Sequence, residues 1–158
     1  MRYLKDACLC IVISLIVFSI SRALGSTFFE NLIGSLLEVI CGVFAINIAS
    51  TALIAELINK VSEKTGYKFE KSKNTLIREL KIQAGLIFAL VFLLVFYYTD
   101  YNKAVYWLVN YKSEILKVTE TGLLSIFIYF IWLTLELGRA LFAILEANYT
   151  IPPKKKED

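Results

Sequence analysis

Four long runs of hydrophobic residues divide this chain. They cover residues 7–24, 32–58, 82–98 and 122–145, and polar residues gather between them. A helix needs about 20 residues to cross the hydrocarbon core of a bilayer, and each run is near or above that length. The pattern therefore predicts an all-α integral membrane protein, a four-transmembrane-helix bundle that forms a single membrane domain over residues 1–158.

The first run also resembles a signal peptide, because Arg2 and Lys5 precede its apolar core and small residues follow it. We expect this run to remain in the protein as a signal anchor and first membrane helix. Residues 26–31 would then form a very short turn, so that the first two helices make an antiparallel hairpin.

The distribution of basic residues predicts the orientation in the membrane. Twelve of the 17 Lys and Arg residues lie at the N-terminus, in the turn over residues 59–81 or in the C-terminal tail, whereas four lie at the two other connections. Basic residues are retained on the cytoplasmic side. We therefore expect both termini and the 59–81 turn to be cytoplasmic in a multi-pass membrane protein.

The second run carries small residues and two carboxylates at steps of three or four, so that all share one helix face. Small residues let a neighbouring helix approach closely, which favours a homo-oligomer. Glu38 and Glu56 lie 18 residues apart on this face, a rise of about 27 Å. Either they reach interfacial water at the two ends of a helix contact, or they mark the mouths of a narrow pathway. The small residues are Gly34, Gly42, Ala45, Ala49 and Ala52.

The fourth run contains two charges, Glu136 and Arg139, at an i, i+3 spacing with Gly138 between them. A lone charge at the centre of a membrane helix costs about 2.5–3.5 kcal/mol on insertion scales, so such residues are usually paired or face water. The spacing allows the two to pair within one helix. We expect a neutralised pair that stabilises the bundle; the alternative is an ion or proton path.

The 59–81 turn is rich in lysine. We expect the second helix to continue past Glu56 as far as Gly66, which can cap it, and the third helix to start near Thr75 with Ser72 or Asn74 as its cap. Two protruding helices joined by a basic turn would form a docking surface for a cytosolic protein; alternatively the lysines only set the topology or contact anionic lipid. The basic residues concerned are Lys60, Lys64, Lys68, Lys71, Lys73 and Arg78.

The connection over residues 99–121 combines aromatic rings with apolar residues at roughly helical spacing. Such rings prefer the headgroup zone of a membrane. We expect a short amphipathic helix on the outer leaflet, acting as a lid over the bundle or as a sensor of outside events.

Common enzyme chemistry finds little support in this sequence. There is no His, and the three Cys residues lie in predicted spans as small apolar packers. Phosphate-binding and dinucleotide-binding motifs are absent from the sequence. We therefore predict no catalytic, cofactor-binding or metal-binding residues and no enzyme activity. The net charge of +3 is a topological signal, and we expect no direct contact with nucleic acid.

The four spans, the small-residue second helix and the basic inner turn together resemble the compact membrane subunits of bacterial anti-phage systems, such as KwaA of the Kiwa system and the RexB exclusion protein. The resemblance covers nearly the whole chain but is architectural, and no functional residue follows from it. It implies an inner-membrane oligomer that is coupled to a cytosolic effector or acts as a channel. Small four-helix transporters, holins and bacteriocin-immunity proteins share the same outline.

Two functional hypotheses follow from these features. In the first, the chain is an oligomeric sensor or anchor subunit in the lipid bilayer that holds a cytosolic protein on its basic turn, in anti-phage defence. In the second, several copies form an ion channel or transporter lined by Glu38, Glu56 and the Glu136–Arg139 pair. A chain of 158 residues is too small to enclose an aqueous path alone, so a pore requires several copies.

Overall fold

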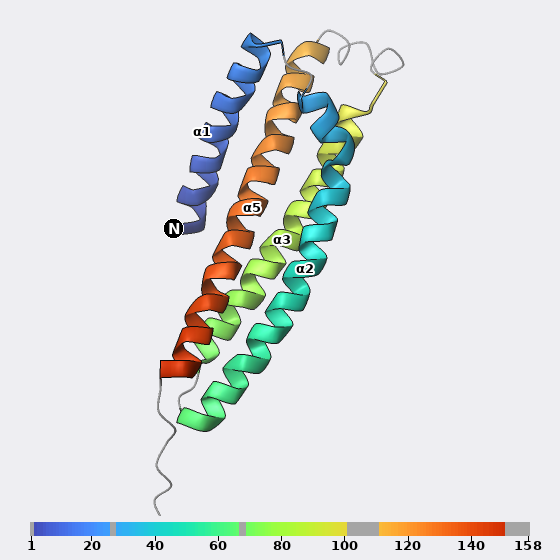
Figure 1. The fold of residues 1–158 in the computed structure, drawn as a ribbon. Helices are drawn as coiled ribbons and strands as arrows, with labels where there is room; N and C mark the ends of the chain where they lie inside the picture. Colours follow the sequence, from blue (N-terminus) through green and yellow to red (C-terminus); the bar gives the residue numbers. More distant parts are fainter. Residues whose placement is uncertain (1, 26–27, 67–68, 101–110, 151–158) are drawn as a thin grey trace, which may run out of the picture. The chain divides into compact units, whose positions relative to one another are not determined.

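The computed structural model describes residues 2–25, 28–66, 69–100 and 111–150, and all regular structure in these parts is helical. The four helices are α1 (Arg2–Ala23), α2 (Phe28–Thr65), α3 (Glu70–Tyr97) and α5 (Lys112–Thr150). Figure 1 shows them along the chain from blue to red. The prediction of an all-helical protein with four long apolar helices is confirmed. Helices α2 and α5 extend beyond both ends of their predicted runs, whereas α1 and α3 begin earlier than predicted and end one residue before their runs do.

Two glycines in left-handed backbone conformation end the first two helices. Gly25, with φ of 62°, follows α1, and Gly66, with φ of 72°, follows α2. The Gly66 N–H donates to the Ser62 carbonyl at 2.8 Å, which satisfies one of the last carbonyls of α2. The predicted continuation of the second helix up to a Gly66 cap is confirmed.

The start of the third helix was misplaced by the sequence. We expected it near Thr75 with Ser72 or Asn74 as the cap, but α3 begins at Glu70 and includes both residues. A carboxylate in the first turn is favourable at the positive end of the helix dipole. The Lys73 N–H donates to the Phe69 carbonyl at 3.1 Å and closes the first turn.

The predicted outer amphipathic helix lies partly outside the described residues, since 101–110 are not described. Residues 112–121 belong to α5, which runs without interruption into the fourth apolar run. No proline separates the two parts, and Gly122 costs an isolated helix position only about 1 kcal/mol. Residues 112–121 of this connection are therefore an extension of the fourth helix.

The described chain divides into two compact units, and unit 1 comprises residues 1–41 and 85–131. Its core includes Leu36, Leu90 and Phe130, each 1% exposed or less. A Cβ atom on Gly122 would lie 2.9 Å from Leu93 Cδ1, so α5 and α3 approach closely at this glycine. Arg22 on α1 and Glu120 on α5 form an ion pair with 3.1 Å between Nη2 and Oε2.

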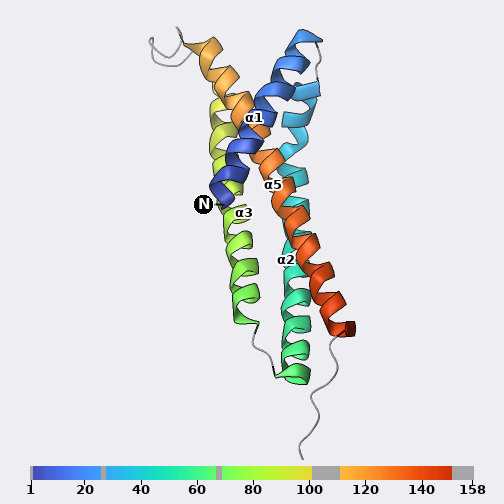
Figure 2. The same cartoon turned by 90° about the vertical axis from the view of Figure 1, so that its left-hand side faces the viewer.

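Unit 2 comprises residues 42–84 and 132–158. Here the later part of α2, the first part of α3 and the later part of α5 run side by side (Figures 1 and 2). A four-residue connection between α2 and α3 makes these two helices an antiparallel hairpin. The buried residues Ile54, Ile58, Leu76 and Leu137 form the core, with Phe69, Leu80, Ala140, Leu141 and Ile144 packed against it.

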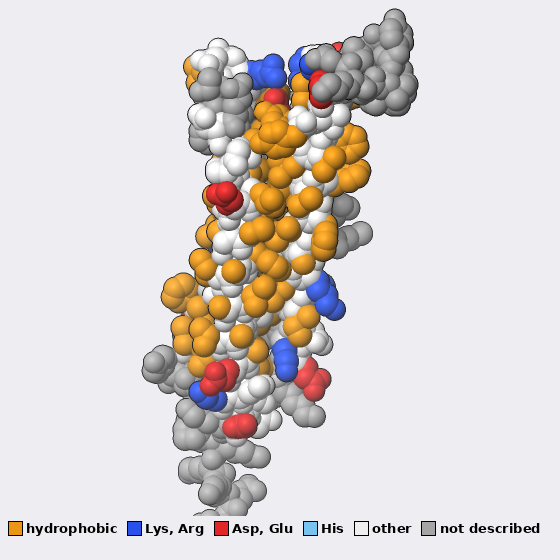
Figure 3. All heavy atoms as spheres, turned by 90° about the vertical axis from the view of Figure 1, so that its right-hand side faces the viewer, with side chains coloured by type: hydrophobic (Ala, Val, Ile, Leu, Met, Phe, Trp, Pro, Cys, Tyr) orange, Lys and Arg blue, Asp and Glu red, His pale blue; other side chains and the backbone are white. Residues whose placement is uncertain are grey.

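All four helices are long and apolar enough to cross a membrane. In the most apolar 18 residues of each helix, between 11% and 22% of the residues are buried within the chain itself. Figure 3 shows hydrophobic side chains over α2 and α3, with most charged side chains toward the helix ends. A soluble monomer rarely exposes so much contiguous apolar surface, so lipid or other protein must cover it.

Candidate functional site

The small-residue face of α2 is exposed along its length. Apart from the adjacent backbone of α2, no atom of the described chain lies within 4 Å of the position that a Cβ would take on Gly34 or Gly42. Ala45, Ala49 and Ala52 are exposed as well. No described part of this chain packs on the face, so close helix packing here would require another molecule.

The two carboxylates of that face lie on the surface. Glu38 is exposed, and Glu56 Oε1 lies 2.6 Å from Lys60 Nζ, with both side chains about 60% exposed. An exposed i, i+4 pair of this kind contributes little to helix stability, because water and salt screen the two charges. A pathway lined by Glu38 and Glu56 would run along the outside of one chain, and further copies would have to enclose it.

The two charges of the fourth run lie in different surroundings. Arg139 is exposed, and its guanidinium carbon lies 5.9 Å from the centroid of the Trp132 ring. This cation–π contact stabilises the charge by about 0.5–1 kcal/mol at an exposed position. Glu136 is half-buried. Mutual neutralisation of Glu136 and Arg139 stays a prediction.

We expect Glu136→Gln and Arg139→Gln, each alone, to reduce the yield of folded protein, because one charge is left uncompensated at membrane depth. Replacing both residues by leucine should restore much of the yield. Monodisperse protein recovered in detergent, measured by size-exclusion chromatography, checks this. Equal yields from the single and double variants would show that the two side chains are independent.

The basic residues of the predicted docking surface are only partly described. Lys60, Lys73 and Arg78 are exposed, on the last turns of α2 and the first turns of α3. Lys68 lies outside the described residues, and the side chains of Lys64 and Lys71 are not described. The three described residues lie in unit 2, on the helical hairpin that α2 and α3 form.

A buried polar junction connects the three helices of unit 2. Asn47 on α2 is 4% exposed, and Gln83 on α3 is fully buried. The Asn47 side-chain amide donates to Gln83 Oε1 at 3.2 Å and to Thr134 Oγ1 on α5 at 2.9 Å. One asparagine thus ties together three helices that otherwise pack through apolar side chains.

Two hydrogen-bonding groups near this junction are buried without a partner. They are the Gln83 Nε2 amide and the hydroxyl of Thr51, which lies one helical turn from Asn47. An unpaired buried polar group costs about 1–3 kcal/mol. The interior of unit 2 therefore offers unsatisfied donors to any acceptor that reaches it.

Asn47 is buried, so it lies off the exposed small-residue face of α2. Sequence reasoning did not single out Gln83 or Thr134. The sequence did contain a signal for a polar junction. Gln83 interrupts an apolar run, and Asn47 and Thr51 are four residues apart, so both lie on one face of their helix. Which polar residues of different helices meet depends on the packing, which one sequence does not give.

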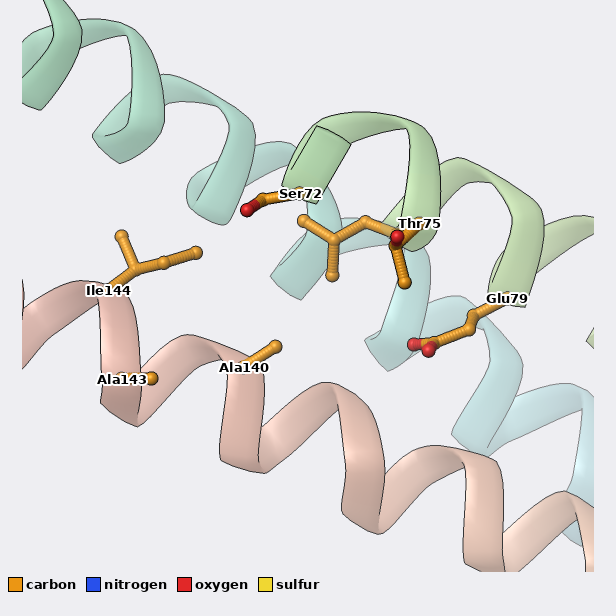
Figure 4. A pocket seen from close by; sticks show the side chains of 7 residues that line it. Ser72, Thr75, Glu79, Ala140, Ala143 and Ile144 are labelled. Carbon is orange, nitrogen blue, oxygen red and sulfur yellow. The ribbon is translucent and has the colours of Figure 1, made fainter. Parts of the chain in front are cut away.

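A hollow of about 310 Å³ opens between α3 and α5 in unit 2. Figure 4 shows Ser72, Thr75 and Glu79 on α3 facing Ala140, Ala143 and Ile144 on α5. Glu79 is only 5% exposed and lies one helical turn from Gln83. Sequence reasoning did not single out Glu79, because it lies among the charged residues Arg78 and Lys81 and looked like part of a solvated turn.

These groups support binding more readily than covalent chemistry. Among the described residues, no group of three or more His, Cys, Asp or Glu side chains is placed to hold a metal ion. The free Cys10 is buried, and Cys8 and Cys41 are exposed on the apolar helices α1 and α2. The polar junction and the Glu79 hollow offer hydrogen bonds and one carboxylate to a bound molecule.

No protein-family model, curated protein or solved structure matches this chain. Its function must therefore be inferred from the residues and their geometry.

Proposed function

We propose that this chain is an integral membrane protein that crosses the bacterial inner membrane four times, with both termini in the cytoplasm. Four helices of sufficient length and apolar composition support the spans. The excess of Lys and Arg at the two ends and in the α2–α3 turn supports the orientation.

Within the membrane, the protein assembles with further copies of itself through the small-residue face of α2. Support comes from the exposure of every small residue on this face and from the open space around Gly34 and Gly42. Lipid gives membrane helices no hydrophobic reason to associate, so close backbone packing of this kind supplies the attraction.

The assembled protein serves as an anchor or sensor subunit that holds a cytosolic protein. The observation that carries this proposal is the helical hairpin of unit 2, where α2 and α3 continue as helices with Lys60, Lys73 and Arg78 exposed. A basic surface attracts an acidic partner and holds it in a salt-dependent way. The resemblance to membrane subunits of anti-phage systems suggests defence against phage as the setting.

Charge reversal of Lys60, Lys73 and Arg78 to Glu should release the partner while the protein still inserts in the membrane. Co-purification from the native host, quantified by mass spectrometry, measures this. Reversal of Lys112 and Lys117, which are exposed on α5 in unit 1, is the matched control and should leave the partner bound. A partner retained equally by both variants would leave only a topological role for the basic hairpin.

Conduction of ions is the second candidate function, and the buried polar junction of unit 2 favours it. Asn47, Gln83 and Thr51 place polar groups, two of them unpaired, inside three apolar helices. Such groups in membrane helices frequently mark ion or substrate pathways. Flux of Na⁺, K⁺ or protons into liposomes carried by the wild type and abolished by Gln83→Leu would make conduction the first hypothesis.

A further inference from the structure

We propose that the hollow of unit 2 beside Glu79 binds an organic cation: a protonated amine attached to an apolar body. This inference depends on neither the anchor function nor the oligomer, because every residue that defines the hollow lies in unit 2 of a single chain.

The walls of the hollow are mainly apolar. Leu76 on α3 and Ala140, Ala143 and Ile144 on α5 line it. The small alanine side chains of α5 leave the space open opposite α3 (Figure 4). A smaller hollow of about 130 Å³ shares Ser72, Ala143 and Ile144 with it. Ile58, Val61 and Phe69 complete this second hollow, so the apolar space continues toward the α2–α3 turn.

From the mouth of the first hollow to its inner end, the lining residues become more buried, and the inner end carries a carboxylate. Ser72 and Ala143 are exposed, whereas Leu76 and Glu79 are buried. Figure 4 shows the Glu79 carboxylate directed into the space between α3 and α5. A molecule that enters past Ser72 therefore meets apolar walls first and a carboxylate at the buried end.

A buried carboxylate in apolar surroundings favours a cationic ligand. Glu79 already interacts with another group of the chain, but its two oxygens together offer about four acceptor positions. A ligand ammonium can add hydrogen bonds there, and the hydroxyls of Ser72 and Thr75 offer further acceptors on the same helix face. Charge-assisted hydrogen bonds are among the strongest in proteins, particularly where water is excluded.

The same lining argues against calcium as the ligand. Calcium takes six to eight oxygen ligands, whereas the described lining supplies one carboxylate and two hydroxyls. The remaining walls are hydrocarbon, which an ion cannot use but an alkyl or aryl group fills. The volume of about 310 Å³ lies at the small end of the range of ligand pockets, about 300–1,000 Å³.

Binding of 4-phenylbutylamine and of its neutral analogue 4-phenylbutanol to the full-length protein in detergent tests this proposal. Both probes also partition into the micelles. Binding is therefore measured by isothermal titration calorimetry and compared between the wild type and each variant, for which this partitioning is the same. We expect Glu79→Gln to weaken amine binding about tenfold or more and to leave alcohol binding unchanged. Glu63→Gln, at an exposed position on α2 in the same unit, should change neither.

A second variant, Ala143→Leu, tests the hollow without changing its charge. It fills space at an exposed position of the mouth and should weaken binding of both probes. The proposal is overturned if neither probe binds the wild type, if Glu79→Gln binds the amine as tightly as the wild type, or if the amine and alcohol bind equally. Circular dichroism confirms that each variant is helical before its titration is interpreted.

The ammonium group could belong to a free amine or to an ethanolamine phospholipid. Nanodiscs containing only phosphatidylglycerol are compared with nanodiscs that also contain phosphatidylethanolamine. Loss of 4-phenylbutylamine binding in the second set identifies the lipid headgroup as the occupant, whereas unchanged binding identifies a free amine. Both interpretations require that Glu79→Gln weaken amine binding about tenfold or more in the first set of nanodiscs.

Discussion

Gly42→Leu is expected to convert the assembled protein into single chains in detergent and to leave the fold of each chain intact. A Cβ on Gly42 would lie more than 4 Å from every other described part of its own chain apart from the adjacent backbone of α2, so the position has room for a side chain within one chain. Against a second copy it would meet a closely packed helix, where overpacking costs about 1–3 kcal/mol. Association should therefore weaken about tenfold or more.

Gly85→Leu is the matched control for this prediction. Gly85 is also exposed, on α3, and also has open space around it, but it lies off the small-residue face of α2. Mass in detergent, measured by light scattering, should fall for Gly42→Leu and stay at the wild-type value for Gly85→Leu. A wild type that is already a single chain would refute the proposed homo-oligomer.

The second large effect is expected at the polar junction, where Asn47→Leu should lower the free energy of unfolding by about 1–3 kcal/mol. The change removes both amide hydrogen bonds of Asn47 and leaves Gln83 Oε1 and Thr134 Oγ1 without this donor. Adding Gln83→Leu should restore part of the loss, because a second buried polar group is then removed together with its cost.

Unfolding in mixed micelles with increasing dodecyl sulfate measures this difference. Asn59→Leu is the control, since Asn59 is exposed on the same helix and should change the unfolding free energy by less than about 0.5 kcal/mol. A membrane hydrogen bond contributes only about 0.6 kcal/mol on average, so a loss above 1 kcal/mol would show that burial of the unpaired groups dominates. If the Asn47→Leu variant unfolds with the same free energy as the wild type, the junction does not stabilise the protein.

The sequence predicted the helices well because long apolar helices are specified by local properties. The length of each apolar run and the glycine at position 66 were sufficient to locate four helices that could span a membrane and the end of α2. Capping residues gave the wrong start for α3, because Ser72 and Asn74 favour cap positions but are tolerated inside a helix, and here the helix already begins at Glu70.

The candidate site was predictable only in part. The small-residue face of α2 was visible as a repeat along one helix, and its exposure agrees with a role in packing against another molecule. The Asn47–Gln83–Thr134 junction joins residues 36 and 87 positions apart. The burial of Glu79 depends on α5 covering α3, which neither charge nor spacing revealed.

Disulfide cross-linking in native membranes tests the proposed assembly most directly. Single cysteines are placed by Ala45→Cys on the small-residue face and by Phe142→Cys at a 72% exposed position of α5, in a background where Cys8, Cys10 and Cys41 are replaced by Ser. We expect Ala45→Cys to give cross-linked dimers under mild oxidation and Phe142→Cys to remain monomeric. Monomer only from Ala45→Cys, or equal cross-linking at both positions, would contradict assembly through the small-residue face of α2.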